Sequence, residues 1–143
     1  MRRNRRGYSL VELMTIVAVV GVLAAIAIPA YQNYAVRSKL SEALAMMGAC
    51  KTSVTDYLVA NRALPANLGA SGCENYAGTQ YVASIDVVDG VITVTMVTTT
   101  KLGPASGGSL KLEPTVDANN FISVWACHPD TVPPRLLPGE CRS

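Results

Sequence analysis

The stretch that decides the fold is residues 6–34, RGYSLVELMTIVAVVGVLAAIAIPAYQNY. From Leu13 to Tyr31 it has no charged residue, and these roughly 19 positions are close to the ~20 that an α-helix needs to cross a bilayer. Four arginines precede it within the first six residues, and one carboxylate, Glu12, lies at its edge. Ionised carboxylates are rarely left without a partner in such a setting. The stretch predicts a helix whose apolar side chains lie in a membrane or against other chains.

Two ordinary explanations of an apolar N-terminal run fit incompletely. A secretory signal peptide has an apolar region of ~7–15 residues that ends in a small-residue cleavage site. Here the run is longer, and the obvious cleavage point, Gly7, precedes it. A plain transmembrane anchor accounts for the arginines, which favour the cytoplasmic side, but not for the position of Glu12. Because such an anchor has the same hydropathy, it remains an alternative for the apolar run.

Two segments carry a family resemblance: 7–14, GYSLVELM, and 23–34, LAAIAIPAYQNY. They closely resemble the N-terminus of type IVa prepilins, and the similarity is dense over residues 7–44. Weaker similarity returns near the C-terminus, at 125–127 (WAC) and 137–141 (LPGEC). The resemblance implies that the apolar helix becomes the core of a filament.

The resemblance also implies a processing site. A dedicated membrane peptidase is expected to remove the basic leader, residues 1–7, by cutting between Gly7 and Tyr8. Glycine suits the cut because it has no side chain to obstruct access to the backbone. The new N-terminal residue, Tyr8, is then expected to be N-methylated, although the family usually has phenylalanine at this position.

Three residues of the apolar run have expected roles in assembly. Cleavage leaves a positive α-amino group on Tyr8, and an unpaired ion is very costly to bury in an apolar bundle. Glu12 supplies the opposite charge, and the resemblance implies pairing with a neighbouring subunit; a solvated interfacial carboxylate is the alternative. Gly21 and Pro29 weaken a helix. The resemblance implies that the helix loosens between such positions in the filament, whereas tolerated kinks are the alternative.

One long helix is predicted from Tyr8 to about Ala60. About 53 residues would make it roughly 80 Å long, so half must protrude from so small a domain, and that half is the apolar one. The second half is amphipathic, with one apolar face packed on the rest of the chain. Its apolar residues recur at steps of three and four: Val36, Leu40, Ala43, Leu44, Met47, Val54 and Leu58. The predicted organisation is a leader (1–7), a transmembrane or filament-core half-helix (8–35) and a globular head (36–143).

The rest of the chain predicts a small sheet, which makes the fold class α+β. After loop-like residues 61–80, two β-rich runs, 81–88 and 91–100, flank Asp89-Gly90, a strong hairpin signal. Residues 109–113 and 120–127 are predicted as two more strands, and the proline-rich tail 128–140 as irregular. The expected architecture is the type IV pilin fold: one long helix packed on a four-stranded antiparallel sheet, with a C-terminal disulfide loop.

Four cysteines, all beyond the apolar run, predict two disulfides on the exported side of the membrane. Their spacing matches no zinc template, so no metal site is expected. Cys127–Cys141 is the bridge that the resemblance leads us to expect, and it closes a loop of about 15 residues, worth ~3 kcal/mol on the chain-entropy model. Cys50–Cys73, a pairing less usual in the family, would attach the 61–80 loop to the helix.

The remaining polar residues give no sign of catalysis or of a cofactor. We expect His128 to be a surface residue, Asp86 and Asp89 to form a turn rather than a calcium site, and Trp125 to pack against the C-terminal bridge. The formal charge of +2 comes from 12 basic and 10 acidic residues, and loss of the four leader arginines leaves 8 against 10, or −2. That balance argues against a strong DNA site, although Lys101, Lys111, Arg135 and Arg142 could cluster locally.

The resemblance implies a structural subunit of a type IV pilus, not an enzyme. Its expected partners are copies of itself, a prepilin peptidase and methyltransferase, the inner-membrane assembly machinery and, before assembly, membrane lipid. The expected locations are the inner membrane and the surface filament of a Gram-negative bacterium. Adhesion, twitching motility and DNA uptake are the functions that the family suggests. The alternatives are a minor pilin, a type II secretion pseudopilin, or a pilus subunit that captures DNA.

Overall fold

The structure is a computed structural model that describes residues 7–73 and 78–142. The chain divides into two compact units, Met1–Tyr34 and Ala35–Ser143, and each is described by itself. Residues 1–6 of the predicted leader lie outside the described residues.

The first unit contains the beginning of helix α1, Leu10–Asn61, as predicted from the sequence to within two residues at each end. The carbonyl of Ser9 accepts a hydrogen bond from the Leu13 backbone N–H at 3.1 Å, which closes the first turn. Up to Tyr34 nearly every side chain is exposed. The large apolar side chains among them are Tyr8, Leu10, Val11, Leu13, Met14, Ile16, Val17, Val19, Val20, Val22, Leu23, Ile26, Ile28, Tyr31 and Tyr34.

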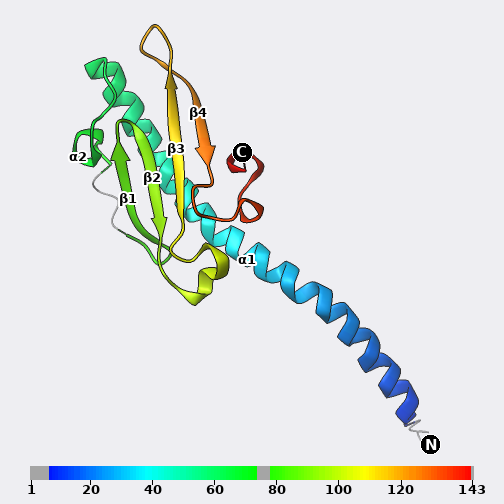
Figure 1. The fold of residues 1–143 in the computed structure, drawn as a ribbon. Coiled ribbons are helices and arrows are strands. Elements are labelled where there is room, and N and C mark those ends of the chain that lie inside the picture. Colours follow the sequence, from blue (N-terminus) through cyan, green and yellow to red (C-terminus); the bar gives the residue numbers. More distant parts are fainter. Residues whose placement is uncertain (1–6, 74–77, 143) are drawn as a thin grey trace, which may run out of the picture. The chain divides into compact units, whose positions relative to one another are not determined.

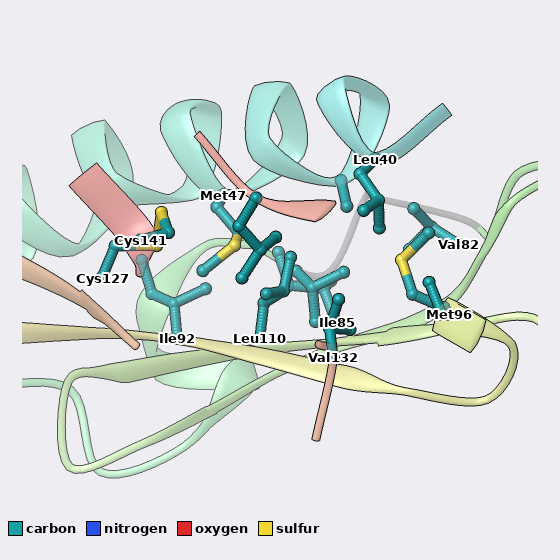
Figure 2. Close-up of a cluster of buried hydrophobic side chains, with 14 of the residues drawn as sticks. Leu40, Met47, Val82, Ile85, Ile92, Met96, Leu110, Cys127, Val132 and Cys141 are labelled. Atoms are coloured by element: carbon teal, nitrogen blue, oxygen red, sulfur yellow. A yellow bond between two sulfur atoms is a disulfide. The ribbon is translucent and has the colours of Figure 1, made fainter. Parts of the chain in front are cut away.

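In the second unit, one face of α1 is buried, because its apolar residues recur at steps of three and four and so share one side of the helix. The buried residues are Val36, Leu40, Ala43, Met47, Cys50, Val54 and Leu58. Figure 2 shows Met47 pointing from the helix toward Ile92 and Leu110 of the sheet, and Leu40 pointing toward Val82 and Met96. This layer between helix and sheet is the core of the unit.

The sheet has four antiparallel strands in the order β1-β2-β3-β4 (Figure 1). They are β1 Val82–Val88, β2 Val91–Met96, β3 Ser109–Val116 and β4 Ile122–His128. Partly buried and fully buried residues alternate along β2, as expected for a strand with one face on the core. The predicted α+β class and the four-stranded antiparallel sheet are confirmed.

The β1–β2 connection is the two-residue hairpin turn that Asp89-Gly90 predicts. Both residues have positive φ, 50° at Asp89 and 81° at Gly90, as a type I′ turn requires. The backbone N–H groups of Asp89 and Gly90 donate to the carbonyls of Ala66 and Pro65, at 3.3 and 2.9 Å. The turn is thereby held against the segment that follows α1.

Two predicted strand ends were wrong by three or more residues, and the other strand bounds differ by at most two. Strand β2 ends at Met96, not at Thr100, because Thr99 caps a short 3-10 segment, η1 Thr100–Ala105. Threonine side chains can bond nearby backbone and so compete with a strand. Strand β3 continues past Glu113 through Pro114 to Val116. Its pairing with β2 stops at Leu112, so one edge of β3 is unpaired around Pro114, and proline is tolerated there.

Two segments predicted to be irregular contain short helices. The 61–80 loop includes α2, Leu68–Ser71, which begins because the Asn67 side chain accepts a hydrogen bond from the Ala70 N–H at 2.9 Å. The proline-rich tail contains two single 3-10 turns, η2 Pro134–Leu136 and η3 Gly139–Cys141. Proline at the start of η2 fixes φ near the helical value, so it favours this turn rather than preventing it.

Candidate functional site

The predicted processing site lies just before α1 and is open. Tyr8 is 78% exposed, and a Cβ built on Gly7 would meet nothing within 4 Å. A peptidase can therefore approach the Gly7–Tyr8 bond without displacing any described part of this chain. Glu12 lies in the first turn of α1 and is exposed. A carboxylate there is favoured by the positive end of the helix dipole, in addition to any partner it finds.

The other two predicted assembly residues, Gly21 and Pro29, lie within α1. Gly21 is exposed, and a side chain there would also meet nothing within 4 Å. Pro29 is the proline inside the helix. It has no N–H to bond the carbonyl four residues earlier, and it leaves the helix locally weaker. No contact among the described residues indicates a role for Gly21 or Pro29 within a single chain.

The apolar run is long and apolar enough to cross a membrane. An 18-residue window within α1 has a mean hydropathy of 2.6, and none of that window is buried by the chain. So large an exposed apolar surface is unusual for a protein in water and marks contact with a membrane or with another chain.

Two disulfides attach peripheral segments to the core. Cys50 on the buried face of α1 is bonded to Cys73, which joins the segment just after α2 to the helix. Cys127 on β4 is bonded to Cys141, which joins the C-terminal tail to the sheet (Figure 2). The tail is held a second way, because Leu136 and Leu137 are fully buried.

Trp125 lies beside the C-terminal bridge, where we expected it. It lines a cleft of about 250 Å³ together with Met47, Lys51, Cys127 and Cys141. The Lys51 ammonium lies 5.7 Å from the centre of the indole ring, within the range of a cation–π contact. The cleft is smaller than most small-molecule sites, so packing is the role that its geometry supports best.

The surface carboxylates have structural roles. Asp130 accepts hydrogen bonds from Lys111, at 2.8 Å, and from the Ser109 hydroxyl, and these two bonds hold its pKa below the usual value. His128 is half-buried rather than fully exposed, and its Nε2 lies 3.8 Å from Glu113 Oε2. Within residues 7–73 and 78–142, no three His, Cys, Asp or Glu side chains come together as a set of metal ligands.

The structure brings together basic residues that the sequence analysis named only in part. Arg37 donates to the backbone carbonyl of Arg135, and Lys39 donates to that of Lys101 at 2.6 Å. Arg142 shares a small cleft with Arg37. Lys111 is not in this group, because it pairs with Asp130. Arg37 and Lys39 flank the buried face of the amphipathic helix, and that spacing was the signal available in the sequence.

Comparison with known proteins identifies the family. Residues 36–142 match a family model described as pilin (bacterial filament), and residues 2–28 match the prokaryotic N-terminal methylation motif. The fimbrial protein EcpC of Eikenella corrodens is 35% identical over 100% of this chain and 94% of its own length. A type IV major pilin, PilE1 of Neisseria gonorrhoeae, is 35% identical over 78% of this chain and 70% of its own length.

A solved structure agrees with the fold. A crystal structure of a Pseudomonas aeruginosa type IV pilin matches 76% of this chain and 98% of its own, with a TM-score of 0.59 and 24% identity. At that identity the likeness concerns the fold alone, but the family model covers most of the chain, and the whole-length relative exceeds 30% identity. This chain therefore belongs to the type IV pilin family.

Proposed function

We propose that the chain is made as a membrane-anchored precursor and becomes the major subunit of a type IV pilus. As a pilin it is a structural protein and not an enzyme. The observation that carries the proposal is the apolar surface of α1 up to Tyr34, which no described part of the chain covers. Lipid can cover it before assembly and copies of the same helix afterwards. In this proposal residues 8–35 are the anchor and filament core, and residues 36–143 are the head.

Processing comes first in this account. A prepilin peptidase cuts between Gly7 and Tyr8, and a methyltransferase modifies the new amino group of Tyr8. The open backbone around Gly7 and the match of residues 2–28 to the N-terminal methylation motif support this step. Inner-membrane assembly machinery then moves the processed subunit into the filament.

Glu12 sets the position of each subunit relative to its neighbour. When the apolar helices pack together, the α-amino group of Tyr8 and the Glu12 carboxylate both leave water. Each charge then needs the other, because an isolated buried ion is very unfavourable. Pairing between neighbours satisfies both charges only at one axial offset. Loosening of the helix between Gly21 and Pro29 would let the packed helices adjust to one another at that offset.

A charge-removing variant tests this proposal. We expect Glu12→Ala to be processed normally but to give at least ten-fold fewer filaments, because breaking one partner of a buried ion pair typically loses about 3–5 kcal/mol. Filaments would be counted by electron microscopy and processing followed by mass spectrometry. Thr15→Val is the matched control: Thr15 is exposed one turn away, and among the described residues its hydroxyl bonds only the Glu12 backbone carbonyl, at 2.9 Å. Normal filaments from Glu12→Ala would refute the role of Glu12.

The filament is proposed to lie on the surface of a Gram-negative bacterium and to serve adhesion, twitching motility and DNA uptake. The support is that the similar proteins are fimbrial proteins and type IV major pilins of Eikenella, Neisseria and Pseudomonas. A minor pilin would share every N-terminal feature, and abundance in purified filaments separates the two. The Cys127–Cys141 bridge favours a pilin over a secretion pseudopilin.

A further inference from the structure

Five cations lie at the end of the 35–143 unit that contains its first residues of α1, from Ala35 onward; we call them the basal collar. They are Arg37, Lys39, Lys101, Arg135 and Arg142. Two backbone contacts bring them together from distant parts of the chain: Arg37 bonds the carbonyl of Arg135, and Lys39 bonds that of Lys101. In Figure 1 the segments that supply them, η1 in yellow-green just before β3 and the tail in red, lie beside the cyan part of α1. Thus five of the eight cations beyond the leader lie at one end of this unit.

The basal collar has little local neutralisation. Among residues 7–73 and 78–142, the ion pairs are Lys111–Asp130 and His128–Glu113, so no collar cation has a carboxylate within 4 Å. Glu42 and Glu140 lie within five positions of collar residues in the sequence, but neither carboxylate comes within 4 Å of a collar cation. At the opposite end, around the hairpin turns, the exposed charges include Asp89 and Asp117.

Part of the basal collar forms a cleft that suits a phosphate attached to an apolar group. The cleft, about 190 Å³, is lined by Arg37, Ser41, Arg142 and four apolar residues, Leu44, Leu136, Leu137 and Pro138. Each arginine is oriented by one bond to a backbone carbonyl, Arg37 to Arg135 and Arg142 Nε to Leu137 at 2.9 Å. A guanidinium has five N–H donors, so several remain to bind phosphate oxygens.

The position of the basal collar along the chain indicates which phosphate it meets. The apolar run ends at two tyrosines, Tyr31 and Tyr34, each more than 70% exposed, and Arg37 follows three positions later. Tyrosines are enriched where a membrane helix leaves the hydrocarbon, and basic residues beside such a helix attract anionic lipid. We propose that the basal collar binds the phosphate headgroups of anionic phospholipids while the subunit is anchored in the membrane. This inference rests on the proposed membrane anchoring and adds lipid selectivity to it.

The test uses the full chain, one copy per nanodisc, in phosphatidylcholine with or without phosphatidylglycerol. Both nanodiscs contain the same small amount of phosphatidylcholine with a nitroxide on its headgroup. The nitroxide speeds the NMR relaxation of backbone amides that lie close to the bilayer surface. We expect the amides of Lys101 and Arg135 to relax faster when phosphatidylglycerol is present, whereas those of Asp89 and Asn120 do not change. The difference should vanish in about 1 M NaCl, where the Debye length is about 3 Å.

A charge-matched pair of variants isolates the collar. Lys101→Gln with Arg135→Gln removes two exposed cations whose side chains make no hydrogen bond or ion pair among the described residues. Each cation near an anionic bilayer is expected to shift the contact equilibrium roughly five-fold, so this variant should lose most of the effect. Lys51→Gln with Arg62→Gln removes the same charge elsewhere in the unit and should keep it.

The outcomes separate this inference from the proposed function. If the chain does not insert into either nanodisc, the membrane anchoring fails, and this inference fails with it. If the chain inserts but phosphatidylglycerol has no effect, lipid binding by the basal collar is refuted and the membrane anchoring is not. Two results would overturn lipid binding and assign the collar another ligand. If inorganic phosphate perturbs the same amides and abolishes the lipid effect, the collar is a free-anion site. If a short DNA duplex binds there in preference to lipid, the collar is a DNA site.

Discussion

At the scale of residues, the side chain of Asp130 and its neighbours hold the segment after β4 to strand β3. Its carboxylate accepts hydrogen bonds from Lys111 and the Ser109 hydroxyl, while the Ser109 N–H donates to the Thr131 hydroxyl at 2.7 Å. The segment after β4 is therefore fixed to the start of β3 before the chain reaches the buried leucines and the second disulfide. Residues of this kind are difficult to find in a sequence, because the partners are about 20 positions apart and all are ordinary surface types.

The Asp130 contacts predict a dependence of stability on pH. The bonds from Lys111 and then Ser109 lower its pKa, so the folded protein binds fewer protons here than the unfolded chain does. The stabilisation is present above the unfolded pKa of about 3.9 and is lost as pH falls through the lower folded value. For an exposed pair it amounts to about 0.2–1 kcal/mol.

The check compares unfolding of Asp130→Asn and of the unchanged chain in detergent as pH falls below about 4. The variant should be less stable at neutral pH and lose less stability on acidification. Asp56→Asn, which removes an exposed carboxylate of α1, should leave the acid profile close to that of the unchanged chain. If Asp130→Asn follows the original profile at every pH, the contacts seen here do not contribute.

At the scale of elements, the β1–β2 hairpin depends on one glycine. Gly90 has φ of 81°, and a Cβ there would meet Leu64 Cδ2 at 2.8 Å and Leu64 Cβ at 3.1 Å. Gly90→Ala therefore combines an unfavourable left-handed conformation, about 1–2 kcal/mol, with overpacking of about 1–3 kcal/mol. We expect a loss of roughly 2–5 kcal/mol in the free energy of unfolding, measured by denaturant titration in detergent.

Gly48→Ala is the matched control for the hairpin. Gly48 lies inside α1, and a Cβ there would meet nothing within 4 Å. Alanine is favoured over glycine in a helix interior by about 0.8–1 kcal/mol, so this variant should be slightly stabilised. Equal effects of the two substitutions would contradict the conformational explanation.

The elements show what a sequence can predict here. The long helix, its buried face and the hairpin were predictable because their patterns extend over many residues or involve a turn with positive φ. The end of β2 at Met96 was not, because the threonines after it favour strands until Thr99 caps a turn. The four-residue helix α2 depends on one asparagine cap. A single asparagine is equally common in loops, so the sequence does not indicate that a helix begins there.

At the scale of the whole molecule, the chain combines a unit with a buried core and a helix segment whose apolar side chains it does not cover. The family could be recognised from the sequence because the N-terminal pattern is specific. The basal collar could be recognised only in part, since backbone contacts of Arg37 and Lys39 gather cations that lie some 60 to 100 positions away. What covers the apolar segment is a property of assembly, which folding of one chain does not determine.

The most direct test of the central claim is the mass of the intact subunit in filaments sheared from the surface of the native cell. We predict a chain that begins at Tyr8, is heavier by one methyl group, and is lighter by the four hydrogens that two disulfides remove. Fragment masses would then place the methyl group on the Tyr8 amine. A subunit that still carries residues 1–7, or filaments that lack this chain while it remains processed in the membrane, would contradict its role as the major subunit.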